Sequence, residues 1–386
     1  MCGVALGTIT TGTTPSKQNS DYYNSDDICF IKPDLLSDSK ITLISISNEY
    51  ISENARTKAR IVGKDSIFVT CIGTIGKIGI ASDGEYAFNQ QINVIKANDT
   101  ILPKYLAYAL FYSKPRLEEI ANAPVVPIIN KTQFESFTIN IEFDKTKQNT
   151  IVSTLDKLQS IITHRKQQLE KLDLLVKARF VEMFGDTEHN SKNFPIHKLC
   201  DLCTVSSSKR IYQNEQSSSG IPFLRISNLV ELIDNSHFET ELFIPEDKYL
   251  ELLENGLVPQ KGDILVTSRG TLGKCYIIQS GDKFYFQDGM ISWLYDFDDS
   301  ITPLYLTLLF GTRNIERQIS NLQSGSTVAY LSITMLKKLE IVVPPLKLQQ
   351  QFAAFVEQTQ KTKAAVQKAL DEAQVLFDSL MQEYFG

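Results

Sequence analysis

The chain has 386 residues, 42% of them hydrophobic and 22% charged, and a formal net charge of −6. This composition is ordinary for a soluble protein with more than one core. The acidic balance argues against indiscriminate nucleic-acid binding, which depends on neutralisation of phosphates by Lys and Arg, but it leaves room for a sequence reader with local basic loops. The chain has no run of 18 apolar residues, and its start carries no positively charged segment. We therefore expect a cytoplasmic protein without a membrane span.

The first strands of the chain are expected to recur in a second copy. Residues 6–12 match 202–208, each a short strand that leads into a small polar loop. Residues 28–36 match 221–230, each a buried strand that ends at a basic residue, Lys32 or Arg225. Residues 194–199 predict a further strand that has no counterpart in the first copy.

The strongest repeat is KDSIFVTCIGTIGKIGI at 64–80 against GDILVTSRGTLGKCYII at 262–278. Each predicts an apolar strand, a turn through two glycines and a second strand that begins after a lysine. A phosphate-binding loop would need an earlier glycine and Ser or Thr after the lysine, and both copies lack them. Strand patterns at 86–95 and 285–294 complete a mainly β core.

Helical stretches at 102–122 and 302–321 close the two globular parts, and a short helix and a final strand follow in each copy. Asp144 in the first copy, and Pro344 with Pro345 in the second, stand where a long helix is expected to begin. The globular parts are thus expected at 1–145 and 186–347, and the long helices at 146–185 and 348–386.

Both long helices carry apolar residues at alternating steps of four and three, which is the pattern of a coiled-coil seam. The second series repeats the first 201 residues later. Arg165 and Lys363 interrupt the seams, either as residues that tune the register and reach solvent or as contacts to a partner or to DNA phosphates. The predicted apolar seam consists of Ile151, Leu155, Leu158, Ile162, Leu169, Leu172, Val176, Phe352, Val356, Val366, Leu370, Phe377 and Leu380.

No set of residues indicates catalysis or a metal site. Clustered carboxylates near Asp34 and Glu246 lack the spacing of a two-metal nuclease and do not recur in the other copy. The chain also lacks the tetrapeptide and the glycine-rich turn of a DNA methyltransferase. Cys200 and Cys203 form a single CxxC pair without a second one, so we expect reduced thiols and no zinc.

The duplicated units, with PFLRISNL, KGDILVTSRGTLGK and VPPLKLQQQF segments that lead into heptad helices, resemble the DNA-specificity (S) subunit of type I restriction-modification enzymes. The resemblance covers nearly the whole chain. It implies two target-recognition domains and two conserved spacer helices in a subunit without catalytic activity. It also implies double-stranded DNA, two DNA-methyltransferase subunits and restriction or translocase subunits as partners. S-adenosylmethionine, ATP and Mg would then bind to those partners, and no cofactor to this chain.

For the seams to meet, the second helix must fold back along the first. We therefore predict an α+β protein with two tandem β-rich domains separated by an antiparallel intramolecular coiled coil, with approximate two-fold symmetry. Two modules on one chain favour a two-part DNA target, with one half-site per domain and an unread gap set by the helices. The alternative is a non-catalytic coiled-coil scaffold that binds proteins and no DNA, which the acidic charge would suit.

The candidates for DNA contact are polar and basic residues of the repeated loops, with Arg269 favoured for guanine because a guanidinium can bond two acceptors of that base. The first copy has Cys71 and Ile72 where the second has Ser268 and Arg269, so its loop is poorer in donors. The candidates are Thr11, Thr13, Lys32, Lys58, Arg60, Thr74, Lys77, Asn89 and Gln90 in the first copy, and Ser207, Lys209, Arg210, Arg225, Ser268, Arg269, Thr271, Lys274 and Gln287 in the second.

Overall fold

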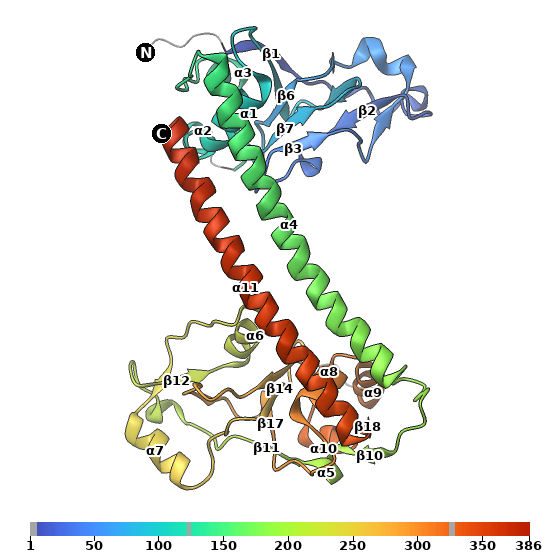
Figure 1. Cartoon of the computed structure of the whole chain (residues 1–386), viewed down its shortest axis with the longest axis vertical. Helices are drawn as coiled ribbons and strands as arrows, with labels where there is room; N and C mark the ends of the chain where they lie inside the picture. Colours follow the sequence, from blue (N-terminus) through green and yellow to red (C-terminus); the bar gives the residue numbers. More distant parts are fainter. Residues whose placement is uncertain (1–5, 122–124, 324–328) are drawn as a thin grey trace. The chain divides into compact units, whose positions relative to one another are not determined.

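The computed structural model describes residues 6–121, 125–323 and 329–386, and the chain divides into two compact units (Figure 1). Unit 1 contains residues 1–169 and 365–386, and unit 2 contains residues 170–364. Each unit therefore holds one globular domain, part of the helix that follows it and part of the other long helix.

Unit 1 contains a five-stranded sheet and a four-stranded sheet, both mixed. The only parallel neighbours in these two sheets are β3 with β7 and β2 with β8. The first sheet has the order β1 (Gly7–Thr11), β9 (Ile92–Ala97), β6 (Ile67–Thr70), β7 (Ile78–Ala81) and β3 (Thr42–Ile44). The second has the order β4 (Tyr50–Ile51), β2 (Ile28–Ile31), β8 (Tyr86–Phe88) and β5 (Ile61–Val62).

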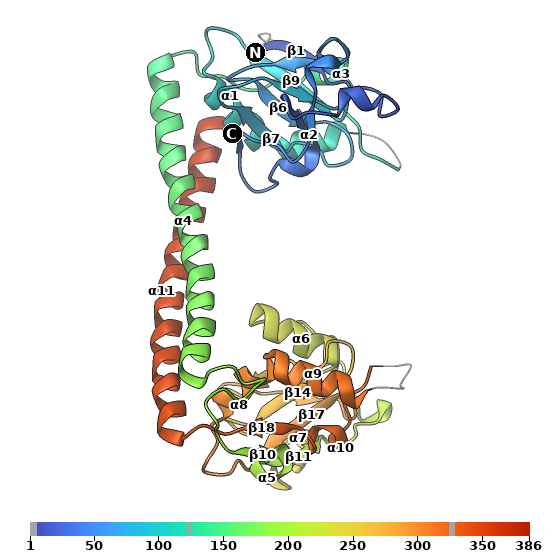
Figure 2. The same cartoon turned by 90° about the vertical axis from the view of Figure 1, so that its right-hand side faces the viewer.

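Strand β6 is buried on both faces, and its alternation assigns each face to a different core. Ile67 and Val69 pack in a cluster with the helices, whereas Phe68 packs with residues such as Phe88 of the second sheet. The helices of this domain are α1 (Pro103–Tyr112), α2 (Lys114–Ile120) and α3 (Lys131–Glu135), and α1 packs on β7 and β9 (Figure 2). The single helical stretch expected at 102–122 is broken at Ser113, which lies two residues before Pro115.

Unit 2 repeats this construction with the strand order β11, β17, β14 and β15 in its main sheet. Ile264 and Val266 face the helices, and Leu265 faces the cluster of Phe286 and Trp293. The strands are β10 (Ile196–Lys198), β11 (Thr204–Ser207), β12 (Ile221–Leu224), β13 (Phe243–Ile244), β14 (Ile264–Thr267), β15 (Cys275–Ile277), β16 (Tyr285–Phe286), β17 (Ile291–Tyr295) and β18 (Glu340–Val342). The helices are α5 (Leu199–Leu202), α6 (Ile226–Asn235), α7 (Glu246–Glu254), α8 (Pro303–Phe310), α9 (Arg313–Leu322) and α10 (Ile333–Leu336).

The two domains differ at their last strand. In unit 2, β18 pairs with β10, the strand expected at 194–199. The final strand expected in the first copy is not formed, because the described residues 137–144 have no ladder partner there. Ile139 and Ile141 of that segment still pack against the core of unit 1.

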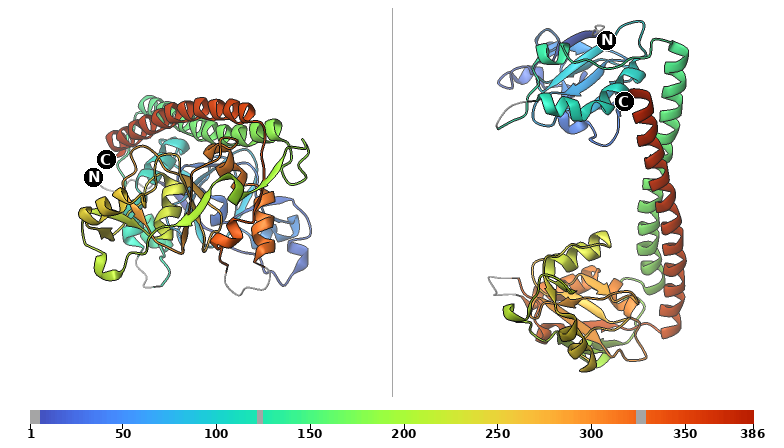
Figure 3. Two further views of the ribbon diagram at one scale, coloured as in Figure 1. Left: turned by 90° about the horizontal axis from the view of Figure 1, so that it is seen from below. Right: turned by 90° about the vertical axis from the view of Figure 1, so that its left-hand side faces the viewer.

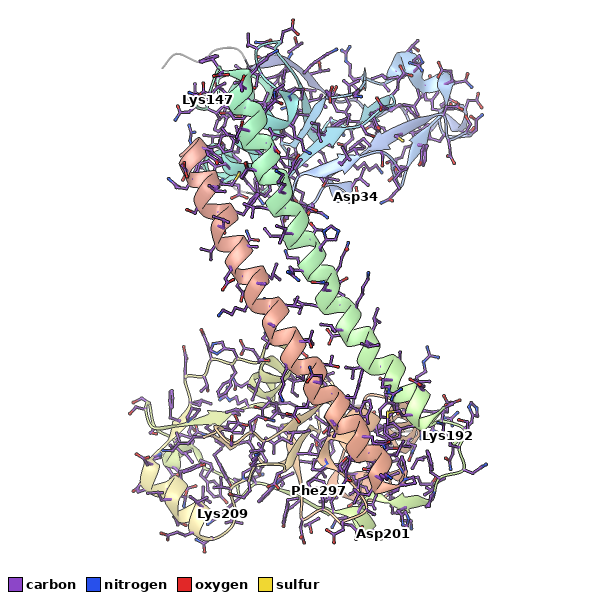
Figure 4. All side chains as sticks on the ribbon, viewed as in Figure 1. Asp34, Lys147, Lys192, Asp201, Lys209 and Phe297 are labelled. Carbon is purple, nitrogen blue, oxygen red and sulfur yellow. The ribbon has the colours of Figure 1, made fainter. Side chains whose placement is uncertain are left out.

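The long helices are α4 (Lys145–Phe184) and α11 (Leu346–Phe385). Asp144 caps α4, with its Oδ1 accepting the amide of Thr146 at 2.8 Å, and α11 begins directly after Pro345. The end of α4 is held as well, because the ammonium group of Lys192 donates to the carbonyls of Glu182 and Met183, both at 2.9 Å. Figure 4 shows Lys147 at the start of this helix and Lys192 beyond its end.

The two helices contact each other along the predicted seam. In unit 1, Leu155 and Ile162 of α4 share a cluster with Leu370 and Phe377, from the last part of α11. Figure 3 shows the ribbons of the two helices side by side. In unit 2, residues from the last part of α4 pack with Phe352 and Val356, from the first part of α11. The helices therefore run antiparallel, and the expected α+β architecture is confirmed. All the predicted seam positions are buried or half-buried.

The two polar residues of the seam have partners on the helices. The Lys363 ammonium lies 2.6 Å from Oδ1 of Asp173, and Nη1 of Arg165 donates to Gln168 at 2.8 Å. Both side chains are half-buried, so their stems pack in the seam while their polar ends bond at its edge. In the part of the chain that the structure describes, no helix combines the length and hydropathy needed to span a bilayer.

Candidate nucleic-acid interface

The glycine turns of the two domains have the same main-chain geometry. Gly73 and Gly76 have φ angles of 79° and 75°, and Gly270 and Gly273 have 70° and 77°, values at which a Cβ would strain the backbone. The amide of Gly76 bonds the carbonyl of Thr70 at 2.9 Å, as that of Gly273 bonds Thr267 at 2.9 Å. The hydroxyl of each threonine accepts the amide of the turn lysine, Lys77 or Lys274, at 3.0 Å.

Each glycine turn is also joined to the neighbouring loops by equivalent backbone hydrogen bonds. In unit 1 the amide of Cys71 bonds the carbonyl of Gln91 at 2.8 Å, and the amide of Ile129 bonds the carbonyl of Cys71 at 2.8 Å. In unit 2 the amide of Ser268 bonds Met290 at 2.9 Å, and the amide of Leu331 bonds Ser268 at 2.9 Å. We call the surfaces so formed loop cluster 1, residues 11–14, 58–60, 71–74, 89–91 and 125–129, and loop cluster 2, residues 207–210, 225, 268–271, 287–290 and 330–331.

Loop cluster 1 brings together predicted residues from distant parts of the chain. The hydroxyl of Thr13 donates to the carbonyl of Lys58 at 3.2 Å and accepts the amide of Arg60 at 3.1 Å. Both basic side chains are exposed, and neither forms an ion pair among the described residues. Thr11 supports the base of the cluster, since its hydroxyl donates to Asn93 at 2.7 Å.

Gln90 is exposed, and its carboxamide oxygen accepts the hydroxyl of Thr14 at 2.6 Å, which orients the amide group. The structure places Asn89 inside, with 6% of its surface exposed and its amide donating to Gln91 at 2.8 Å, so it shapes the turn. Thr74 is exposed at the glycine turn.

Two predicted lysines of unit 1 lie beside acidic side chains of the fold. Lys32 pairs with Glu49 and lies 6.0 Å from the centre of the Phe30 ring. Lys77 is half-buried beside the ion pair of Lys114 with Asp38, whose hydrogen bond lowers the pKa of the Asp38 carboxyl. Lys32 would have to leave Glu49 before it could bind DNA.

In loop cluster 2, the loop that follows β11 is closed by the turn after β16. The hydroxyl of Ser207 accepts the amide of Gly289 at 3.2 Å, and Nε of Arg210 lies 2.8 Å from Asp288, which raises the pKa of the guanidinium. Lys209 is exposed, and its ammonium lies 3.7 Å from Glu251 of α7, beside which Figure 4 shows it.

Arg269 is exposed at the glycine turn, with its Nη1 3.8 Å from the sulfur of Met290 and its backbone bridged to Tyr330. Arg225 is also exposed, and its guanidinium has no ion pair in the described residues. Neither arginine forms an ion pair among the described residues, so these two are the cations of loop cluster 2 that a ligand could bind.

Three further predicted residues of unit 2 form hydrogen bonds inside the domain, through their side chains or their backbone. Ser268 is 2% exposed, and its hydroxyl lies 2.7 Å from that of Ser292. Lys274 bonds both carboxylate oxygens of Asp234 on α6, at 2.6 and 2.7 Å. Gln287 is half-buried and its amide bonds Leu224 at 2.9 Å, whereas Thr271 is exposed.

Sequence reasoning did not select the apolar residues of loop cluster 1 or Tyr330 of loop cluster 2. Val125, Val126 and Ile128 are all exposed, and Ile128 forms a bridge to Ile72 that corresponds to the bridge of Tyr330 to Arg269. An apolar run before a short helix was the available signal, although such a run is more often buried.

Acidic groups near the clusters, such as Glu49 and Asp288, pair with lysine or arginine. They neutralise cations of the same surface and do not converge on one point. In the described ranges, no group of three His, Cys, Asp or Glu residues is arranged to hold a metal ion. The clusters therefore offer amide, hydroxyl and guanidinium groups and apolar side chains, which are the groups that read base edges and phosphates.

Comparison with known proteins shows which family the chain is similar to. The domain described as "Type I restriction modification DNA specificity domain" matches residues 5–172 and 191–374. The type I restriction enzyme MjaIX specificity subunit of Methanocaldococcus jannaschii is 25% identical over 377 residues, covering 91% of this chain and 84% of that protein. The HindI specificity subunit of Haemophilus influenzae is 32% identical over 178 residues, covering 44% of this chain and 38% of that protein.

Solved structures agree in fold. The S subunit of a type I restriction-modification system from M. genitalium has a TM-score of 0.58 at 16% identity, covering 98% of this chain and 93% of that one. A chain from a study of complex assembly and conformational transition of the type I system has a TM-score of 0.57 at 14% identity, covering 98% and 97%. The chain therefore belongs to the family of type I restriction-modification DNA specificity subunits, whose general role is recognition of the DNA target.

Proposed function

We propose that this chain reads a two-part DNA target, one part with each loop cluster, and that the two long helices fix the length of the unread gap. The observation that carries the proposal is the common main-chain framework of the clusters, which presents different side chains at equivalent places. The carbonyl of Cys71 accepts the amide of Ile129 as that of Ser268 accepts Leu331, while the next residue is Ile72 in one copy and Arg269 in the other. Two domains that recognise different base sequences need the same backbone geometry and different side chains on it.

The basic residues without ion pairs would contact different parts of the DNA. Lys58 and Arg60 in unit 1 and Arg225 in unit 2 are exposed without ion pairs among the described residues, and they suit phosphate contacts. Arg269 suits a bidentate contact to a guanine in the major groove. The overall charge of −6 does not oppose this, because Glu49 and Asp288, two acidic residues next to the clusters, are already paired with basic side chains.

In this proposal the chain recognises DNA and catalyses no reaction itself. Two DNA-methyltransferase subunits would dock on it, and translocase-endonuclease subunits would join the restriction complex, as the resemblance of the sequence implies. S-adenosylmethionine, ATP and Mg would be bound by those subunits. The complex would act in the cytoplasm, on the DNA of the cell.

The test is co-purification of the full chain with its methyltransferase subunits, followed by mapping of methylated adenines in DNA treated with the complex. We expect a motif of two short specific stretches separated by a constant number of unread base pairs. Methylation without such a motif, or a complex that shifts all DNA equally at physiological salt, would contradict the proposal and favour a protein scaffold.

A further inference from the structure

Loop cluster 1 carries an apolar patch that faces solvent. The exposed fractions of Val125, Val126 and Ile128 are 88%, 48% and 41%, and Pro127 between them is exposed as well. Single exposed apolar residues are ordinary on protein surfaces, but a contiguous group in a loop indicates a binding surface.

The patch is held in place by the fold. Ile129, directly after it, is 2% exposed and belongs to the core of unit 1. The carbonyl of Pro127 accepts the amide of Gly73 at 2.9 Å, and Ile128 is bridged to Ile72. These bonds present the side chains of the patch outward beside the glycine turn, at the place where unit 2 presents Tyr330 beside Arg269.

The patch is continuous with the polar part of loop cluster 1. Cys71, next to Ile72, bonds the turn that carries Gln90, and Gln90 bonds Thr14. Thr13 then bonds the segment of Lys58 and Arg60. An occupant of the patch would thus meet an oriented carboxamide and free cations on the same surface.

We propose that this patch contacts the C5-methyl group of thymine in the major groove, so that the first half-site contains thymine at the place where the second domain reads its base with Arg269. The inference rests on the proposed function and specifies the bases involved. Thymine is the only base with a methyl group in the major groove, and small apolar side chains are its partners in direct readout. Neither Ile72 nor the valines can donate a hydrogen bond, so the patch selects by shape and by burial of the methyl group.

A docking surface for a protein subunit is the other candidate occupant. Two identical methyltransferase subunits would require the same chemistry on both domains, as identical partners bind equivalent surfaces. The equivalent places instead differ, with valine and isoleucine in unit 1 and arginine and tyrosine in unit 2. Divergence at equivalent places favours DNA, because the two half-sites are themselves free to differ.

The experiment uses the complex of the full chain with its methyltransferase subunits and a duplex that contains the mapped target. Each thymine of the first half-site is replaced in turn by deoxyuridine, which lacks only the C5-methyl group. We expect binding to weaken about fourfold at one or two of these positions, the factor that burial of one methyl group provides. Replacement of thymine by deoxyuridine in the second half-site should change binding equally in the wild type and in variants of the patch.

The protein variants complete a cycle with the modified DNA. V125A/V126A and the isosteric V126T should bind more weakly, and their preference for thymine over deoxyuridine should be smaller than that of the wild type, because each variant presents less apolar surface to the methyl group. V126T keeps the side-chain volume, so weaker binding by this variant would not result from a cavity that unfolds the domain. L43A is the matched control, since Leu43 is 68% exposed in the same unit but lies on edge strand β3, outside loop cluster 1.

The outcomes are distinct. A complex that binds no two-part target contradicts the proposed function. A complex that binds its target, but tolerates deoxyuridine in place of every thymine of the first half-site, contradicts the thymine contact alone. Loss of methyltransferase subunits from V126T, with thymine preference intact, would identify the patch as a subunit contact and would also overturn the inference.

Discussion

Replacement of Gln349 by Met tests how α11 is fixed to the domain it follows. Gln349 is fully buried, and its amide nitrogen donates to the carbonyls of Ser300 and Pro344, both at 2.8 Å. Its carboxamide oxygen accepts the amide of Thr302 at 2.8 Å and the hydroxyl of Thr302 at 3.1 Å. Methionine has a similar length and removes all four bonds, so the loop and the helix start would lose their common partner.

The expected cost follows from the backbone groups left without partners. A buried polar group without a hydrogen bond costs about 1–3 kcal/mol. Ser300 and Thr302 are half-buried, so water can reach part of this region, and we take the low end for each of the three groups. The free energy of unfolding should therefore fall by about 3 kcal/mol, a large part of the ~5–15 kcal/mol typical of a domain.

Urea unfolding of the full chain, followed by tryptophan fluorescence, measures this change. Trp293 is the only tryptophan, is 4% exposed and lies in unit 2. The midpoint for Q349M should fall by about 1 M urea or more. Q350M is the matched control, because Gln350 is the exposed neighbour on the same helix and its replacement should leave the midpoint unchanged.

The equivalent residue of unit 1 provides a second comparison. Gln148 is fully buried and bonds the amide of Leu102 at 2.7 Å and the carbonyl of Glu142 at 2.6 Å. Q148M should destabilise unit 1 and shift the Trp293 signal less than Q349M does. Equal midpoints for Q349M and wild type would refute the reasoning, since the four bonds would then contribute nothing measurable.

Three further predictions concern reading, spacing and thiol reactivity. R269A should reduce discrimination at one base pair of the second half-site by about tenfold or more, equivalent to about 1–3 kcal/mol, in competition binding against single-base variants of the target; unchanged discrimination at all positions would remove Arg269 as a reader. One heptad inserted into both α4 and α11 adds about 10 Å of helix and should lengthen the gap of the methylated motif by about 3 base pairs, whereas an unchanged gap would show that the helices do not set it. Burial raises the pKa of the Cys71 thiol to about 12 and that of Cys203 to about 12, so at pH 8 both should resist alkylation while exposed Cys200 reacts, as peptide mass spectrometry would show; equal rates would contradict the burial.

The sequence predicted the elements that local patterns determine. The apolar run Ile67–Val69 predicted a strand, and the structure divides its side chains between two cores, with Ile67 and Val69 in one and Phe68 in the other. The heptads predicted α4 and α11, whose antiparallel contact follows from their order along the chain. Gly73 and Gly76 predicted a turn because positive φ angles favour glycine.

The sequence patterns did not predict which side chains pair across the fold. Lys274 was expected to face a ligand, yet it bonds Asp234, 40 residues away on a helix that the first copy lacks. Arg210 bonds Asp288, 78 residues away. Periodicity gives the face of an element and says nothing about which distant loop meets it, so the ion pairs that occupy candidate cations emerge only from the tertiary structure.

The arrangement of these bonds would allow one fold to carry the two specificities that we propose. The loops are held by backbone amides and carbonyls, as between Cys71 and Ile129 or between Ser268 and Leu331, and such bonds form whatever side chain follows. The helices are held to their domains by Gln148 and Gln349, which lie outside the loop clusters. Substitution of the outward side chains therefore leaves both sets of bonds intact, because those side chains contribute to neither. The exposed chemistry can then change from apolar at Ile72 to cationic at Arg269 while the backbone that positions it stays the same.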